Sequence, residues 1–175
     1  MLKANLFSLC LFVAAATLAL ADDPFNGQFK ANLTGYNEVP AVLTTGSGQV
    51  TVAASSDRTA LNVTLKFNKL VGVAQSASLY LGSSGTTGGT VALLCGGTAP
   101  ACPATANGTV TITLSASDVL AIPAQGLAAG DLAGAIQAWA NGAIYVNVIT
   151  SKFASGEIRG QVSHGFFVGN FGRGE

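Results

Sequence analysis

Charged residues are scarce in this sequence, since Asp, Glu, Lys and Arg make up only 9% of its 175 residues. The few basic residues are scattered and form no stripe, which argues against a nucleic-acid partner. Histidine occurs once, at His164, and neither a Gly-x-Ser-x-Gly elbow nor a Walker phosphate loop is present. We therefore expect a protein that is not an enzyme, with no catalytic residue, no metal and no cofactor.

Cysteine is also rare, with three in the chain. Cys10 lies in an apolar N-terminal run, so Cys95 and Cys102 are the pair that remains in the body of the chain. A metal-binding pair is the competing interpretation, but two cysteines without further Cys or His nearby cannot complete a four-ligand zinc shell. We predict a Cys95–Cys102 disulfide, which would stabilise the fold by roughly 2–3 kcal/mol and persist in an oxidising compartment.

The N-terminus has the pattern of an export signal. Lys3 is followed by an uncharged apolar run over residues 6–20 and by small residues up to Ala21. This pattern predicts a signal peptide over residues 1–21 that is removed by cleavage. The run is shorter than the roughly 20 residues that span a bilayer. We expect a secreted, extracellular protein, or a periplasmic or cell-surface protein if the host is bacterial, with no membrane span after cleavage.

Beyond the leader, apolar and polar residues alternate with period two in most segments, which is typical of β-strands. Gly, Asn, Ser or Asp separates most of these segments, as in antiparallel sandwiches and barrels. We predict an all-β, antiparallel, Greek-key-like sandwich or barrel of about eight strands over residues 22–163, followed by a Gly/Phe-rich tail over residues 164–175. The predicted strands are residues 28–33, 49–54, 60–67, 76–81, 90–94, 109–114, 143–150 and 157–163.

Two short helices are expected to interrupt the strands. Ser115 and Asp118 have the spacing of a capping box that opens a single turn. The second helix begins after Asp131, a good N-cap, carries Leu132, Ile136 and Trp139 on one face, and ends at residues 141–142. We expect this second helix to cover one end of the barrel.

Several segments carry a family resemblance. These are LTGYNEVPAV at residues 33–42, GSGQV at 46–50, YVNVIT at 145–150 and GEIRGQ at 156–161. Together they resemble the CHRD domain, the repeat first recognised in the extracellular signalling antagonist chordin. The resemblance covers roughly residues 27–162 and implies a secreted β module that makes protein contacts outside the cell.

The chain departs from the family where histidines are expected. Similar domains commonly carry AHIH and YVNVHT, whereas this chain has Ser78, Tyr80 and Ile149 at the histidine positions. An apolar Ile cannot replace a metal ligand. Tyr145 and Asn147 share the strand face of Ile149, so this face is either a small pocket or a repacked core in which Tyr80 and Ile149 fill the volume of the lost imidazoles.

Two acidic residues and one arginine stand out within the resembling segments. Glu38, Glu157 and Arg159 belong to these segments, and we expect all three to be structural. We predict that Arg159 forms a bidentate pair with Glu38 or Glu157 and thereby fixes the register of neighbouring strands. A ligand-binding arginine is the alternative.

Three Asn-x-Thr sequons, at Asn32, Asn62 and Asn107, are possible glycosylation sites. The sequence as a whole predicts a secreted, non-enzymatic module with a binding or structural role, whose partner is an unidentified extracellular protein or surface component. The alternatives are a degenerate metal-binding or redox module and a surface-assembly subunit. The assembly alternative is suggested by the absence of charge between Lys69 and Asp118 and by the tail.

Overall fold

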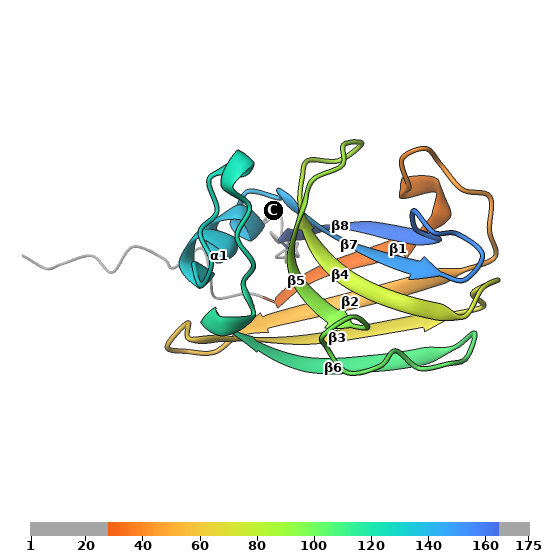
Figure 1. Cartoon of the computed structure of the whole chain (residues 1–175), viewed down its shortest axis with the longest axis horizontal. Helices are drawn as coiled ribbons and strands as arrows, with labels where there is room; N and C mark the ends of the chain where they lie inside the picture. Colours follow the sequence, from red (N-terminus) through yellow and green to blue (C-terminus); the bar gives the residue numbers. More distant parts are fainter. Residues whose placement is uncertain (1–27, 165–175) are drawn as a thin grey trace, which may run out of the picture.

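A computed structural model describes residues 28–164, which form one eight-stranded antiparallel sheet curled into a nearly closed barrel (Figure 1). The predicted all-β antiparallel fold is thus confirmed. The predicted signal peptide lies outside the described residues, as does all of the tail except His164, the last residue of the eighth strand. The strands are β1 (Gln28–Thr34), β2 (Ser47–Ala54), β3 (Ala60–Asn68), β4 (Ala74–Leu81), β5 (Gly89–Cys95), β6 (Gly108–Ser115), β7 (Ile144–Thr150) and β8 (Ile158–His164).

The alternation of side chains builds the core inside this barrel. In β3 the inward residues Leu61, Val63, Leu65 and Phe67 are buried, while the residues between them face outward. Inward residues of the other strands join them in one continuous apolar cluster. Because period two places successive side chains on opposite faces, each strand's outward face is left for loops or solvent to cover.

The strand order is β5-β4-β7-β8-β1-β2-β3-β6. β8 therefore lies between β7 and β1, and Phe29 near the start of β1 pairs with His164 at the end of β8. The edge strands β5 and β6 do not pair with each other, so a seam runs between them.

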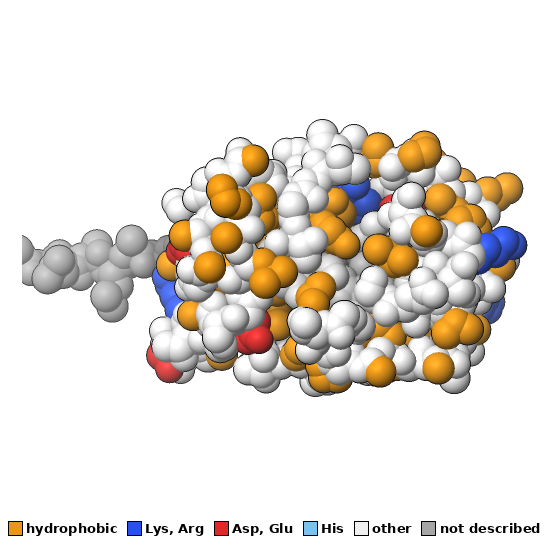
Figure 2. All heavy atoms as spheres, in the orientation of Figure 1, with side chains coloured by type: hydrophobic (Ala, Val, Ile, Leu, Met, Phe, Trp, Pro, Cys, Tyr) orange, Lys and Arg blue, Asp and Glu red, His pale blue; other side chains and the backbone are white. Residues whose placement is uncertain are grey.

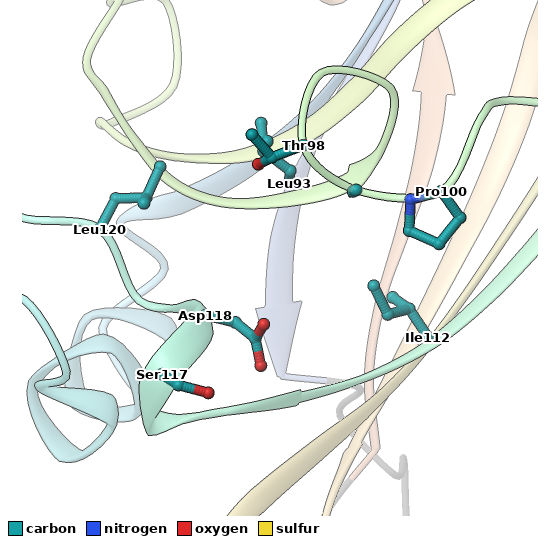
Figure 3. A pocket seen from close by; sticks show the side chains of 8 residues that line it. Leu93, Thr98, Pro100, Ile112, Ser117, Asp118 and Leu120 are labelled. Carbon is teal, nitrogen blue, oxygen red and sulfur yellow. The ribbon is translucent and has the colours of Figure 1, made fainter.

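The seam is covered by a loop and a turn. The predicted Cys95–Cys102 disulfide is confirmed and fixes the loop that follows β5. On the other side, the backbone N–H of Leu120 donates to the carbonyl of Val91 at 2.8 Å, which occupies part of the β5 edge. A hollow of about 240 Å³ remains between these segments, with Leu93 and Pro100 on one side and Ile112 and Leu120 among its other walls (Figure 3).

One end of the barrel, which we call the helix end, is covered by α1 (Leu132–Ala140) (Figure 1). The Asp131 side chain caps this helix by accepting from the Gly134 N–H at 2.8 Å, and Leu132, Ile136 and Trp139 are buried, as predicted. The predicted capping box of Ser115 and Asp118 is also present, but the turn that it opens is the 3-10 turn η2 (Ala116–Asp118). Two further 3-10 turns, η1 (Gly35–Asn37) and η3 (Pro123–Gln125), were not predicted.

The opposite end, which we call the loop end, is formed mainly by three connections: β1–β2 over residues 35–46, β3–β4 over residues 69–73, and β7–β8 over residues 151–157. The end of the β5–β6 connection joins them through hydrogen bonds to Lys69 and Leu70. These connections lie at the right of Figure 1, far from α1 along the long axis of the molecule. Among residues 28–164, no helix is both long enough and apolar enough to cross a membrane.

Candidate functional site

The residues at the family's histidine positions lie on β4 and β7, on the outer face of the sheet. Ser78 is opposite Asn147, and Tyr80 is opposite Tyr145. The barrel interior is lined instead by the alternate residues of β7, of which Val146 and Val148 are fully buried.

The expected repacked core between Tyr80 and Ile149 is therefore wrong in two respects. This face points away from the core, and Ile149 lies opposite Ser76, four residues along β4 from Tyr80. The segment YVNVIT carries apolar residues on both faces, so alternation alone did not reveal which face the barrel encloses.

A three-layer stack occupies this outer face. The Tyr80 and Tyr145 rings are nearly parallel, with centroids 5.1 Å apart. The Arg159 guanidinium carbon lies 3.5 Å from the centroid of the Tyr145 ring. The Tyr145 hydroxyl accepts from the Gly88 N–H at 3.2 Å. Burial raises the pKa of the Tyr145 phenol, and this hydrogen bond and the Arg159 charge act in the opposite direction.

Arg159 makes different contacts from those predicted. It is almost fully buried, and its Nη2 donates to the Ser83 carbonyl at 3.2 Å. Within the part of the chain that the structure describes, no ion pair of 4 Å or less joins Arg159 to Glu38 or to Glu157. The predicted bidentate pair is therefore not formed, because stacking on Tyr145 and the hydrogen bond to Ser83 hold the guanidinium instead.

Glu38 and Asn147 meet beside Gly156. Glu38 Oε1 and Asn147 Oδ1 are both buried without a hydrogen-bond partner, while Asn147 Nδ2 donates to the Ser155 carbonyl at 2.9 Å. Gly156 has a φ of 135°, and a Cβ at this position would collide with both unpartnered oxygens. Two acceptors thus point toward one place from which any larger residue is excluded.

Burial raises the pKa of Glu38 to about 7, and the Arg159 charge offsets part of this rise. A protonated Glu38 carries an O–H that can donate to Asn147, whereas an ionised Glu38 has acceptors only. The burial that raises the pKa of Glu38 and the unpartnered Asn147 oxygen beside it therefore both favour the protonated form of the Glu38 carboxyl.

Glu157 is fully buried and connects the segments of the loop end. Its carboxylate accepts from the hydroxyls of Thr44 at 2.7 Å and Thr150 at 2.9 Å, and from the N–H groups of Val71 at 2.6 Å and Gly72 at 3.1 Å. Burial alone would raise the pKa of Glu157, but these four hydrogen bonds outweigh it and hold the pKa below its ordinary value. The ionised carboxylate thus ties the β1–β2 and β3–β4 loops to β7.

These fixed loops present apolar side chains to solvent. Tyr36 is 72% exposed and Leu43 is 83% exposed, and three valines of the same loops are about half exposed or somewhat less. Figure 2 shows hydrophobic side chains gathered at this end beside basic ones. A hollow of about 280 Å³ lies next to Glu38 and Gly156, with apolar walls from Val39, Pro40, Val42 and Phe153. Sequence reasoning missed this surface; the signal was apolar residues in a Gly- and Thr-rich loop.

The three sequon asparagines, Asn32, Asn62 and Asn107, are all exposed on the barrel. The Asn62 Oδ1 accepts from the Thr113 hydroxyl, and the Asn107 Oδ1 accepts from the Lys69 N–H. Their glycosylation stays a prediction. Across residues 28–164, no group of three His, Cys, Asp or Glu side chains lies together as a metal site would require.

The comparisons with known proteins give one positive result. The family model described as the CHRD domain matches residues 29–162. No curated protein and no solved structure matches the chain significantly. The matched residues begin one residue into β1 and end in β8, so they include most or all of every strand of the barrel, together with the outer-face stack and the loop end. The chain belongs to the CHRD domain family.

Proposed function

We propose that this protein is a non-enzymatic extracellular binding module, and that the loop end is its binding surface for a protein partner. The observation that carries the proposal is the set of exposed apolar side chains, led by Tyr36 and Leu43, on loops that the buried Glu157 holds in place. Exposed apolar patches on soluble domains mark interaction sites.

The loop end has the composition and rigidity of a protein-binding surface. Tyrosine is enriched among residues that dominate binding energy, and the loop end exposes Tyr36 as well as the aliphatic Leu43 and Val71. Because the Glu157 carboxylate already fixes the Thr44 and Val71 segments, little loop ordering has to occur on binding. Such preorganisation lowers the entropic cost of association.

The proposed location and the absence of catalysis have separate supports. The Cys95–Cys102 disulfide and the CHRD family both favour an oxidising, extracellular setting. Glu38 has the raised pKa of many catalytic acids. However, although Glu38 borders a hollow, its Oε1 is buried and faces Asn147 and Gly156, away from any molecule in that hollow.

The test uses site-specific photo-crosslinking of the purified chain in extracellular fluid from its source. A crosslinker is placed at Leu43 on the loop end or at Thr111, an exposed residue on the outer face of β6. We expect a discrete protein adduct from Leu43 only, which excess unlabelled chain suppresses and a Tyr36→Ser/Leu43→Ser variant does not. Identical adducts from both positions, or equal suppression by the variant, would contradict the proposal.

A further inference from the structure

We propose that the loop end of one molecule binds the helix end of a second copy, so that the chain assembles head to tail. This inference rests on the proposed function, because it names the partner of the same loop-end surface. Three features of the molecule favour it: opposite charge at the two ends, a groove along α1, and the placement of the two surfaces at opposite ends.

The exposed charge of the loop end is basic. Lys69 and Lys152 are exposed there, whereas the two acidic residues of the same end, Glu38 and Glu157, are buried. Because Glu157 is satisfied internally by four hydrogen bonds, its charge is not available to a partner. A partner therefore meets lysines interspersed with apolar side chains.

The helix end offers acidic groups to such a surface. Asp57 in the β2–β3 turn and Asp118 in η2 are exposed, and Asp131 is partly exposed at the start of α1. Arg58 also lies at this end. Figure 2 shows acidic side chains at the helix end together with basic ones, while the basic side chains of the loop end lie at the other extreme of the molecule. Electrostatic attraction thus favours contact between unlike ends over contact between like ends.

The helix end also provides a receptor for protruding side chains. A groove of about 560 Å³ follows α1, bordered by Asp131 and Arg58 and floored mainly by small or apolar residues such as Ala133, Gly134 and Ile136. Small residues leave room for a neighbour to approach closely. The exposed Tyr36 and Leu43 of the loop end are the kind of apolar projections that such a groove accepts.

The placement of the two surfaces decides the type of assembly. The loops and α1 lie at opposite ends of the long axis of the barrel (Figure 1). Contact between unlike surfaces is heterologous, and it gives an open chain of molecules when the rotation between neighbours does not close a ring. A symmetric dimer through either surface would instead bring two like ends together.

The experiment is sedimentation velocity of the mature chain left by the predicted cleavage, over a range of protein concentration and salt. The loop-end variant is Leu43→Asp/Lys152→Glu, and the helix-end variant is Ala133→Arg/Gln137→Arg, which places bulk and positive charge on exposed positions of α1. A control, Thr111→Asp/Lys30→Glu, makes the same change in net charge as the loop-end variant on exposed side positions of the barrel. Circular dichroism and thermal unfolding check that every variant is folded.

We expect the wild type and the control to form species larger than a dimer as concentration rises, less readily at high salt. Each end variant alone should associate at least about tenfold more weakly. An equimolar mixture of the two end variants should form a dimer and nothing larger, because one intact loop end then meets one intact helix end.

Two results would overturn head-to-tail assembly. One is a wild type that stays monomeric at every concentration. The other is a wild type that forms a dimer and nothing larger, together with a mixture of the two end variants that forms no dimer. Either result leaves the crosslinking test of the loop end unaffected, so failure of this inference is distinct from failure of the proposed function.

Discussion

Replacing Glu38 by Gln should make the protein more stable at alkaline pH, because the carboxyl of Glu38 is almost completely buried and ionises there. The carboxyl has a pKa of about 7 in the folded protein, against 4.5 as its ordinary value. The folded state therefore holds the Glu38 proton more tightly than the unfolded state does. This contribution to stability is fully present below pH 4.5, declines as pH rises toward 7, and stays lost above it.

The size of the effect follows from the pKa. The rise from 4.5 to about 7 corresponds to at most about 3–4 kcal/mol, at roughly 1.4 kcal/mol per pH unit. A hollow beside Glu38 lets solvent screen part of the charge, so we expect about 2 kcal/mol. Glu38→Gln keeps the shape of the side chain and a donor for the Asn147 oxygen but cannot ionise.

The assay is urea unfolding of wild type, Glu38→Gln and Glu38→Ala across the pH range from acid to mildly alkaline. The difference between wild type and Glu38→Gln should be small in acid and reach about 2 kcal/mol in favour of the variant near pH 8. Glu38→Ala should lose the same pH dependence but be less stable at every pH below the titration, because it also removes packing. If the free energy of unfolding depended on pH in the same way for wild type and Glu38→Gln, or if Glu38→Gln were less stable than wild type at pH 8, the reasoning would be refuted.

Three further changes test other contacts. Glu157→Gln should lower the free energy of unfolding by about 2–4 kcal/mol, because an amide cannot accept all four hydrogen bonds; urea unfolding measures this, and a near-neutral result would contradict the role of Glu157. Arg159→Ala should lower the free energy of unfolding by about 2 kcal/mol, because it removes the stack on Tyr145 and the hydrogen bond to Ser83. The control Lys152→Ala, at an exposed position, should lower it by less than about 0.5 kcal/mol. Equal melting temperatures for the two variants would contradict this role of Arg159. Replacing Cys95 and Cys102 by Ala should cost roughly 2–3 kcal/mol in thermal unfolding, and an unchanged melting temperature would show that the loop needs no clamp.

The fold was largely predictable because local patterns and tertiary structure agree. Alternation in segments such as Ala60–Asn68 placed the strands, and Asp131 with Leu132, Ile136 and Trp139 placed the helix and its buried face. The pairing of Cys95 with Cys102 followed from the small number of alternatives. In each case the local sequence alone indicates the structure: alternating apolar residues form a strand, Asp131 caps a helix, and the two cysteines pair with each other.

The outer-face site was less predictable, because its contacts join residues far apart in the chain. Arg159 was singled out from the sequence, but its contacts with Tyr145 and Ser83 instead of an acidic partner depend on how the β4–β5 loop lies over the sheet. Likewise, the meeting of Glu38 with Asn147 requires the β1–β2 loop to fold back over β7. Period-two patterns report which residues share a strand face, but not which loop covers that face.

The pairing of β1 with β8 also decides how the molecule can be handled. Phe29 and His164 are neighbours across two adjacent strands, so the chain enters and leaves the barrel side by side at the helix end. A tag, a surface tether or a fused domain joined directly before β1 or directly after β8 is therefore attached at that end and leaves the loop end facing outward. Either tether suits a display format for screening loop-end ligands, whereas sedimentation experiments call for an untagged chain.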